Sequence, residues 1–139
     1  MFTKKETIRF KHVDFAGIVF YPRFLEMLND LVEDWFDEAL ERPFSKMHDT
    51  GNGIPTVDLK VQFKKAAKIG DELQKSLWVI SIGSASVSCG FRFTHADGAV
   101  CLEGEVTLVN VVIDKTSGGI KAETFSNEIR NNIEKYLVG

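Results

Sequence analysis

Cysteine, proline and histidine are scarce in this chain of 139 residues, and their scarcity excludes several kinds of site. The two cysteines, Cys89 and Cys101, lie in segments of alternating apolar residues and not in CxxC or Cys/His clusters, so the sequence offers no zinc site. We expect two reduced, packed thiols, with a bond between them as the alternative. The three histidines, His12, His48 and His95, have no metal-ligand spacing, so we expect no metal cofactor.

Long apolar runs and an excess of basic residues are also absent. The N-terminus, MFTKKETIRF, lacks the apolar stretch of a signal peptide, and no later segment is apolar enough to span a membrane. A net charge of −3 without a basic cluster argues against nucleic acid as a partner. With 44% hydrophobic and 27% charged residues the chain has the balance of a folded domain. We expect one cytoplasmic domain spanning residues 1–139.

A strongly amphipathic stretch near the N-terminus is the most conspicuous feature that is present. Pro22 suits the first helical position, because the N–H that proline lacks would be unpaired there. Arg42 and Pro43 are predicted to stop the helix. Its opposite face is acidic and predicted to be solvated. The apolar stripe, at helical spacing, consists of Phe24, Leu25, Leu28, Leu31, Val32, Trp35, Phe36, Ala39 and Leu40.

Other segments alternate with a period of two, which predicts strands. In the first of them, Ile8, Phe10 and His12 are expected to face inward. The segment 44–53 is expected to be a turn-rich connection with room for one short helical turn, and Thr124 or Ser126 could cap a final helix. The order β-α-β-β-β-β-α predicts an α+β domain with a curved antiparallel sheet of about five strands packed on one long helix. The expected strands cover residues 6–12, 56–64, 72–82, 86–95 and 100–113, and the final helix 124–137.

Asp14 is the sharpest candidate for a catalytic residue. It lies in a loop with Gly17, just before the long helix, where a carboxylate could approach the positive end of the helix dipole. The alternative is a turn aspartate that bonds its own backbone. Tyr21 is expected to be the N-cap, next to N–H groups that lack helical partners and could bind an oxyanion. Together the two features suggest acyl transfer.

Other nucleophiles and bases have weaker support. His12 is expected to be a satisfied core histidine. Cys89 lies in an apolar strand, where burial raises the pKa of a thiol and makes it unreactive. The serines Ser84, Ser86 and Ser88 lack a GxSxG context, so a serine triad is not predicted.

The segment HVDFAGIVFYP resembles the Asp-x-Ala-Gly-Ile-Val-aromatic-Tyr-Pro signature of the 4-hydroxybenzoyl-CoA thioesterase family of hotdog-fold proteins. The resemblance implies a hotdog fold, in which a sheet wraps around one central helix. It further implies hydrolysis of an acyl-CoA thioester, with coenzyme A as part of the substrate and no separate cofactor. A homodimer or a dimer of dimers (a homotetramer) is implied as well. The Tyr-Pro form at residues 21 and 22 is nearer the branch of the family that acts on aromatic acyl groups.

Carried over by residue, the resemblance makes Asp14 the catalytic carboxylate, and the Tyr21 N–H the group that polarises the thioester carbonyl. At the turn 83–86 the family has basic residues for the phosphates of coenzyme A, whereas this chain has Ser84 and Ser86. Lys121 falls near another basic position of that phosphate site. The expected substrate-binding residues are Phe15, Gly17, Phe20, Asn29, Val57, Ser84, Ser86 and Lys121.

Three other functions are open to a chain of this kind. One is a thioesterase that acts on acyl carrier protein, and another is a non-catalytic acyl-CoA-binding protein, against which the intact Asp14 argues. A hotdog dehydratase would need a catalytic histidine with a carboxylate, and His12 is poorly placed for that role.

Overall fold

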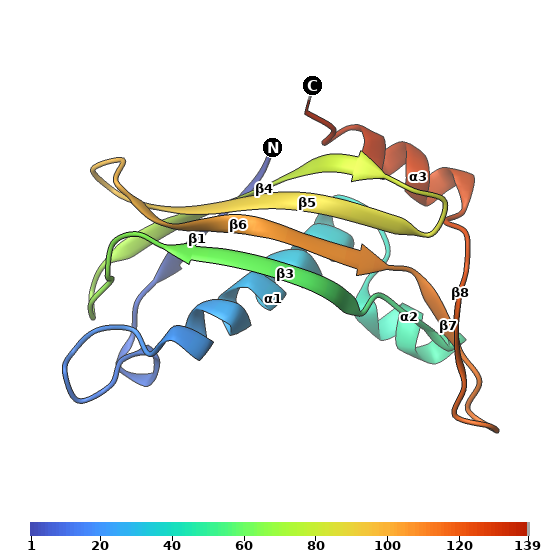
Figure 1. Cartoon of the computed structure of the whole chain (residues 1–139), viewed down its shortest axis with the longest axis horizontal. Coiled ribbons are helices and arrows are strands. Elements are labelled where there is room, and N and C mark those ends of the chain that lie inside the picture. Colours follow the sequence, from blue (N-terminus) through green and yellow to red (C-terminus); the bar gives the residue numbers. More distant parts are fainter. Residues whose placement is uncertain (139) are drawn as a thin grey trace.

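The structure, a computed structural model, describes residues 1–138 and has an α+β architecture built on a curved antiparallel sheet (Figure 1). The sheet has the strand order β1-β4-β5-β6-β3, so β1 and β3 are its edges. Its strands are β1 (Phe2–Thr7), β3 (Thr56–Phe63), β4 (Glu72–Ile82), β5 (Ser86–His95) and β6 (Val100–Val109). The predicted α+β class with an antiparallel sheet is therefore confirmed, with the expected bounds for β4 and β5, whereas the chain has more elements than the predicted order β-α-β-β-β-β-α.

Helix α1 (Tyr21–Glu38) is the longest of the three α-helices within residues 1–138 and lies against the concave face of the sheet (Figure 1). Its apolar stripe packs on the inward-facing side chains of β4, β5 and β6, so removal of this apolar surface from water stabilises the fold. α1 begins one residue earlier than predicted and ends at Glu38, although Leu40 still packs in the core. The largest fully buried side chains include Trp35, Phe36, Phe91, Phe93, Leu73, Leu77, Leu102 and Leu108.

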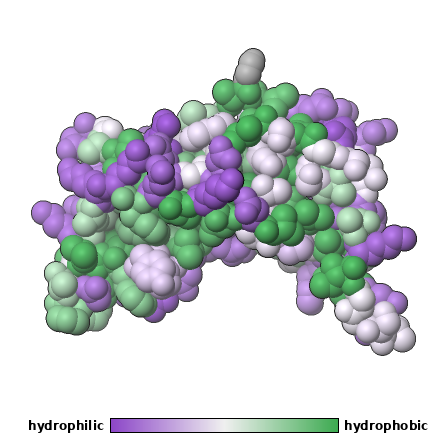
Figure 2. Space-filling model, viewed as in Figure 1, coloured by the Kyte–Doolittle hydropathy of each residue, from purple (hydrophilic) through white to green (hydrophobic). Residues whose placement is uncertain are grey.

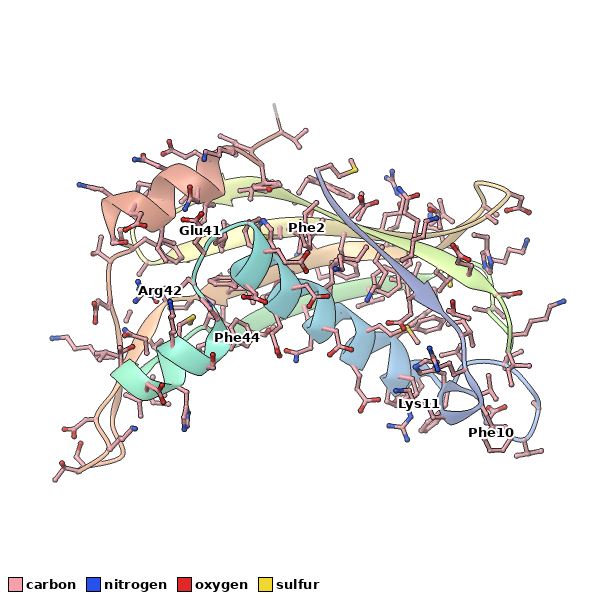
Figure 3. The ribbon with its side chains drawn as sticks, turned by 180° about the vertical axis from the view of Figure 1, so that it is seen from behind. Phe2, Phe10, Lys11, Glu41, Arg42 and Phe44 are labelled. Carbon is pink, nitrogen blue, oxygen red and sulfur yellow. The ribbon has the colours of Figure 1, made fainter. Side chains whose placement is uncertain are left out.

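The first strand was predicted wrongly, because β1 covers Phe2–Thr7 and pairs with β4. Beyond it, the Ile8 N–H bonds the carbonyl of Asp71, and the chain then turns into a short 3-10 helix, η1 (Phe10–His12). Phe10 consequently points outward and is 82% exposed, not buried (Figure 3). Ile8 and His12 are buried as expected, but outside a strand.

The second half of the chain departs from prediction at three places. The expected strand 100–113 breaks at Asn110, whose N–H donates to Ala85 and whose side chain donates to Glu123, both carbonyls outside the main sheet. The break leaves β7 (Val111–Ile113) to form a small second sheet with β2 (Asn52–Gly53) and β8 (Ile120–Ala122). The connection 44–53 contains α2 (Phe44–Thr50), and the final helix is α3 (Asn127–Glu134), capped by Ser126 as one of the two expected caps.

No helix among the residues that the structure describes has both the length and the apolar character needed to cross a membrane.

Candidate active site

Residues 12–20 form a tight hairpin that joins η1 to α1. The Phe20 N–H donates to the carbonyl of His12 and the Asp14 N–H to that of Ile18, each at 3.0 Å. Gly17, at φ +83°, closes the turn by donating to the Asp14 carbonyl, a conformation that a side chain would strain. Phe20, the residue before α1, lies opposite His12, and Asp14 is two residues beyond His12. Since a strand advances about 3.3 Å per residue, Asp14 lies roughly 7 Å along the hairpin from Phe20.

The Asp14 carboxylate is exposed and uses one of its two oxygens within the turn. Oδ1 accepts a hydrogen bond from the Ala16 N–H at 2.8 Å, so the side chain does bond its own backbone. Oδ2 has no hydrogen-bond or ion-pair partner among residues 1–138. The turn thereby fixes the orientation of the carboxylate and leaves its second oxygen without a partner in the described chain.

The start of α1 offers one unpaired backbone donor beside this hairpin. Phe20, not Tyr21, is the N-cap, with an extended backbone held by its bond to His12, and Tyr21 and Pro22 are the first two helical residues. The Tyr21 N–H donates no hydrogen bond within residues 1–138, whereas the Arg23 N–H is taken by the Phe20 carbonyl. A free N–H at the positive end of an 18-residue helix is suited to bind a developing oxyanion.

Aromatic rings gather at the same end of the sheet. The rings of Phe20 and Tyr21 meet edge to face at 5.7 Å, and Tyr21 meets Phe63 of β3 at 6.2 Å. Phe63 is 51% exposed and was not among the predicted substrate-binding residues, because only the fold brings the end of β3 to the start of α1. Phe15 is fully exposed, while Phe24 is buried in the core, as the sequence favoured.

Val57, Ser84, Ser86 and Lys121 do not join Asp14 within one chain. They lie at the other end of the sheet, where the start of β3 pairs with the end of β6, Ser86 pairs with Val109 and Lys121 lies on β8. Val57 and Phe63 are six positions apart along extended β3, a separation of about 20 Å. Asn29 is exposed on α1 between the two ends, about 12 Å along the helix from Tyr21.

Arg130 of α3 is a basic residue at the turn 83–86 that was not predicted from the sequence. Its guanidinium donates to the carbonyls of Gly83 and Ser84, at 2.6 and 3.2 Å. The turn lacks basic residues of its own, so this arginine supplies its positive charge from 46 residues away in the sequence. No local pattern near the turn could have revealed it.

The other candidates considered from the sequence are structural. His12 is buried and its Nδ1 accepts the Arg9 N–H at 2.8 Å, which makes it the satisfied histidine that was expected. Cys89 and Cys101 are free and buried, and burial raises their thiol pKa values to about 12 and about 11. Within residues 1–138 no three His, Cys, Asp or Glu side chains are arranged to hold a metal ion.

The buried state of His12 predicts a pH dependence of stability. Burial lowers the pKa of this imidazole below its usual value of 6.5, so the unfolded chain binds the proton more tightly. The stabilisation is therefore present above about pH 6.5 and is lost as the pH falls through the folded pKa. In His12→Asn, an Oδ1 that does not titrate replaces Nδ1. We expect the free energy of unfolding, measured in urea between about pH 7.5 and 5, to fall more steeply in the natural protein. Equal slopes would contradict this role.

Comparisons with known proteins give a consistent family and fold. The profile of the thioesterase-like superfamily matches residues 8–133. A 1,4-dihydroxy-2-naphthoyl-CoA hydrolase of Synechocystis sp. is 24% identical over 102 residues, 73% of each chain. Among solved structures, 4-hydroxybenzoyl-CoA thioesterase from Pseudomonas sp. strain CBS-3 superposes with a TM-score of 0.84 at 19% identity, covering 94% of this chain and 97% of that one. A gentisyl-coenzyme A thioesterase gives 0.81 at 22% identity, covering 92% and 98%.

Proposed function

Because the chain belongs to the thioesterase-like superfamily, a group of hotdog proteins, we propose that it hydrolyses acyl-CoA thioesters with an aromatic or short acyl group. One observation carries the proposal. The free Asp14 Oδ2 and the free Tyr21 N–H are held at the same junction of hairpin and helix. A carboxylate and an oxyanion donor are the two groups that thioester hydrolysis requires.

In the proposed reaction, the carbonyl oxygen of the thioester accepts the Tyr21 N–H, in line with the dipole of α1. One such donor lowers the barrier by about 3 kcal/mol, because charge develops on that oxygen in the transition state. Asp14 Oδ2 either attacks the carbonyl carbon or takes a proton from an attacking water. In both routes the carbon–sulfur bond breaks and the coenzyme leaves as its thiolate. After direct attack, the acyl group remains on Asp14 as a mixed anhydride, which water hydrolyses to the free acid. After general-base catalysis, the attacking water supplies the new oxygen of the acid, and its proton passes through Asp14 to the thiolate. This route needs no metal or redox cofactor.

The acyl group is proposed to lie against the exposed rings of Phe20, Tyr21 and Phe63. Flat aromatic walls favour a planar group through offset or edge contacts. The three similar proteins named above act on naphthoyl, hydroxybenzoyl and gentisyl thioesters, which supports an aromatic acyl group here. Phe15 and Gly17 would border this slot from the hairpin. Asn29, farther along α1, is proposed to meet a polar substituent.

A second copy of the chain is proposed to complete the site along β3. This strand is an edge, and its apolar side chains lie uncovered, with Val57 59% exposed. Figure 2 shows that hydrophobic residues reach the surface on this side of the molecule. An unpaired edge strand is a template for pairing, and a two-fold dimer could pair β3 with its own copy in antiparallel fashion. That pairing would bring Val57 of the partner subunit toward Phe63 and the start of α1. We therefore propose that the protein forms a homodimer through β3, or a tetramer made of two such dimers.

The same pairing suggests how the coenzyme is held. The end of the sheet that carries Ser84, Ser86 and Lys121 in the partner would face the Asp14 end of the first subunit. Arg130, which reaches the turn 83–86, adds the positive charge that the turn itself lacks. We propose that this end of the partner binds the phosphates of coenzyme A.

The acyl preference can be measured with a panel of CoA thioesters. We expect kcat/KM to be higher for benzoyl-type thioesters than for palmitoyl-CoA, since the aromatic slot suits flat groups better than long flexible chains. Release of free thiol, followed at equal protein concentration, gives the ratio directly. A tenfold advantage of long chains, worth about 1.4 kcal/mol, would reject the aromatic reading and leave general acyl-CoA hydrolysis. No thiol release from any member would reject the proposed activity itself.

A further inference from the structure

His12 joins the hairpin 12–20 to the chain that precedes it, and the proposed reaction gives its side chain no role. Its N–H donates to the Arg9 carbonyl and its carbonyl accepts the Phe20 N–H, each at 3.0 Å. The imidazole is only 7% exposed, and its Nδ1 accepts the Arg9 N–H at 2.8 Å. Arg9 and His12 are therefore bonded to each other twice, once through the backbone alone and once through the ring.

The chain just before Arg9 is anchored at the turn that precedes β4. The Ile8 N–H donates to the Asp71 carbonyl, and the Ile8 carbonyl accepts the Gly70 N–H, each at 2.8 Å. The ring of His12 thus bonds a segment of backbone whose position is fixed by the sheet. Through this bond the hairpin takes its place relative to the body of the protein.

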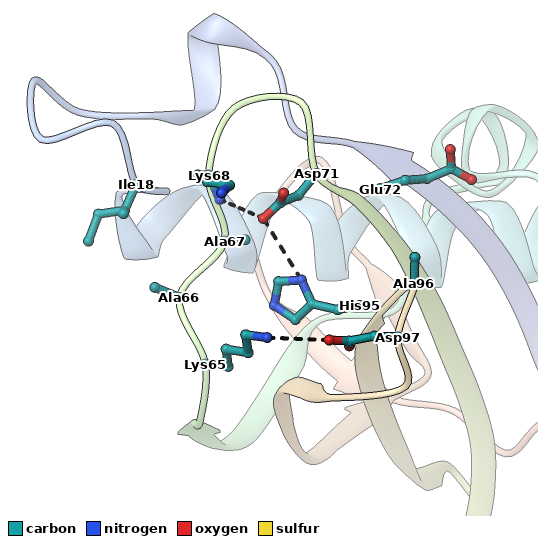
Figure 4. Close-up of a pocket in the computed structure, with 10 residues that line it drawn as sticks. All are labelled: Ile18, Lys65, Ala66, Ala67, Lys68, Asp71, Glu72, His95, Ala96 and Asp97. Carbon is teal, nitrogen blue, oxygen red and sulfur yellow. Dashed lines mark hydrogen bonds and ion pairs between the residues drawn. The ribbon is translucent and has the colours of Figure 1, made fainter.

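The two arms of the hairpin are held in different ways. The second arm, residues 18–20, bonds the segment before β4 directly, since the Val19 N–H donates to the Ala67 carbonyl at 2.9 Å. Figure 4 shows Ile18 of this arm beside Lys68, with which it forms a β-bridge. The first arm, residues 12–14, carries Asp14, and its one side-chain hydrogen bond beyond the hairpin within residues 1–138 is that of His12. The place of the carboxylate therefore depends on the bond of the His12 ring.

The ring makes this bond only as a neutral imidazole. With Nδ1 as the acceptor, the proton of the neutral ring is on Nε2, and a second proton would turn Nδ1 into a donor that faces another donor. His12 lines a cavity of about 380 Å³, so the ring can take up a proton from solvent. Burial nevertheless lowers its pKa below 6.5, which keeps the ring neutral at pH 7 and above. The charged groups around it are Glu6 of β1, Arg9 and Lys11 at η1, and Arg23, Glu26 and Asp30 of α1.

We propose that His12 is a positioning residue for thioester hydrolysis, whose ring holds the Asp14 carboxylate in place relative to the Tyr21 N–H. The inference rests on the proposed function, because it assigns a role within the same site. The His12 carbonyl engages Phe20, the last residue before α1, and Asp14 follows His12 by two residues. A displacement of about 1 Å between reacting groups can lower a rate about 100-fold. Loss of the bond should therefore lower kcat and leave substrate binding largely unchanged.

Two substitutions at His12 separate the bond from the ring. His12→Leu removes the acceptor and keeps a buried side chain, and should lower kcat at pH 7.5 at least tenfold while KM changes less than about threefold. His12→Asn keeps an acceptor, Oδ1, and should restore kcat to within about threefold of the natural value. The substrate is the CoA thioester that the natural protein hydrolyses fastest, and kcat is divided by the folded fraction from circular dichroism. A natural kcat in His12→Leu, or equal losses in both variants, would overturn the proposal.

The pH profile of kcat is a readout that a merely structural histidine would not move. In the natural protein, kcat per folded molecule should fall as the pH is lowered from about 7.5 through the pKa of His12, because protonation breaks the bond to Arg9. In His12→Asn the acceptor does not titrate, so kcat should fall less over the same range. His48→Asn, which removes an exposed imidazole from α2, should keep the natural profile. Superimposable profiles for the natural protein and His12→Asn would contradict the assignment.

Amide hydrogen exchange tests the positioning without reference to activity. In His12→Leu, the Phe20 N–H, which bonds the His12 carbonyl, should exchange at least tenfold faster. The Val19 N–H bonds the Ala67 carbonyl and should change little, so this neighbouring amide is the internal control. Equal changes at both amides, or no change at either, would refute the role of the ring. If the natural protein releases no thiol from any thioester, the proposed function fails, and the exchange pattern alone decides whether His12 holds the hairpin.

Discussion

Replacing Asp14 by asparagine should lower kcat for thioester hydrolysis by roughly 10²- to 10⁴-fold and leave the fold intact. The amide oxygen can still accept the hydrogen bond of the Ala16 N–H, so the turn should keep its shape. The amide, however, cannot attack a carbonyl or take a proton from water. The substitution therefore removes the reactive carboxylate and keeps the shape of the turn. Steady-state release of thiol, with the melting temperature as a check on folding, measures both effects.

Asp114→Asn is a matched control for this experiment. Asp114 also accepts an N–H two residues ahead, that of Thr116 at 2.9 Å, in an exposed turn of the hairpin between β7 and β8. Its replacement should leave kcat within twofold of the natural value, on the order of an ordinary surface substitution. Near-full turnover by Asp14→Asn would reject this carboxylate and turn attention to Glu26 or Asp30, on the exposed face of α1.

Disrupting the exposed edge of the sheet should also lower activity strongly. Leu59→Lys places a charge in the uncovered apolar row of β3, where a paired copy of the strand would bury it. We expect the variant to be monomeric by light scattering and to lose at least tenfold in kcat/KM. Loss of activity follows because each proposed site takes Val57 from the partner subunit.

The opposite edge of the sheet provides the control. Thr3→Lys places the same charge on β1, the other edge strand, at an exposed position. This variant should remain dimeric and active. A Leu59→Lys protein that is monomeric and retains full activity would show that one chain suffices, and would refute the shared site.

Elements whose pattern is set by their own burial were predictable from sequence. β4 and β5 alternate because one face packs on α1, and α1 itself shows a continuous apolar stripe, so each has the expected type. β1 and the break at Asn110 were not predictable, because backbone bonds to distant turns decide them. The Ile8 N–H bonds Asp71, and the Asn110 N–H bonds Ala85. Neither partner can be read from nearby residues.

The candidate site likewise contains some residues that the sequence predicts and others that only the fold brings into place. Asp14 and Tyr21 are close in sequence, so a short motif indicates both. Phe63 and Arg130 reach their positions only through the pairing of strands and the docking of α3, and neither was assigned to a site from the sequence. Val57 lies far from Asp14 within the chain, as a residue that acts in the site of a partner subunit would.

Mixing two inactive variants tests the central claim, a site shared between subunits, most directly. Asp14→Asn removes the carboxylate, and Val57→Trp fills the space that β3 would offer to the substrate of the partner. Each homodimer should be inactive, but a mixed dimer has one site with Asp14 and Val57 both intact. After unfolding and refolding together in equal amounts, random pairing predicts roughly a quarter of the natural activity. A refolded mixture that is dimeric by light scattering and no more active than its two parents would contradict the account.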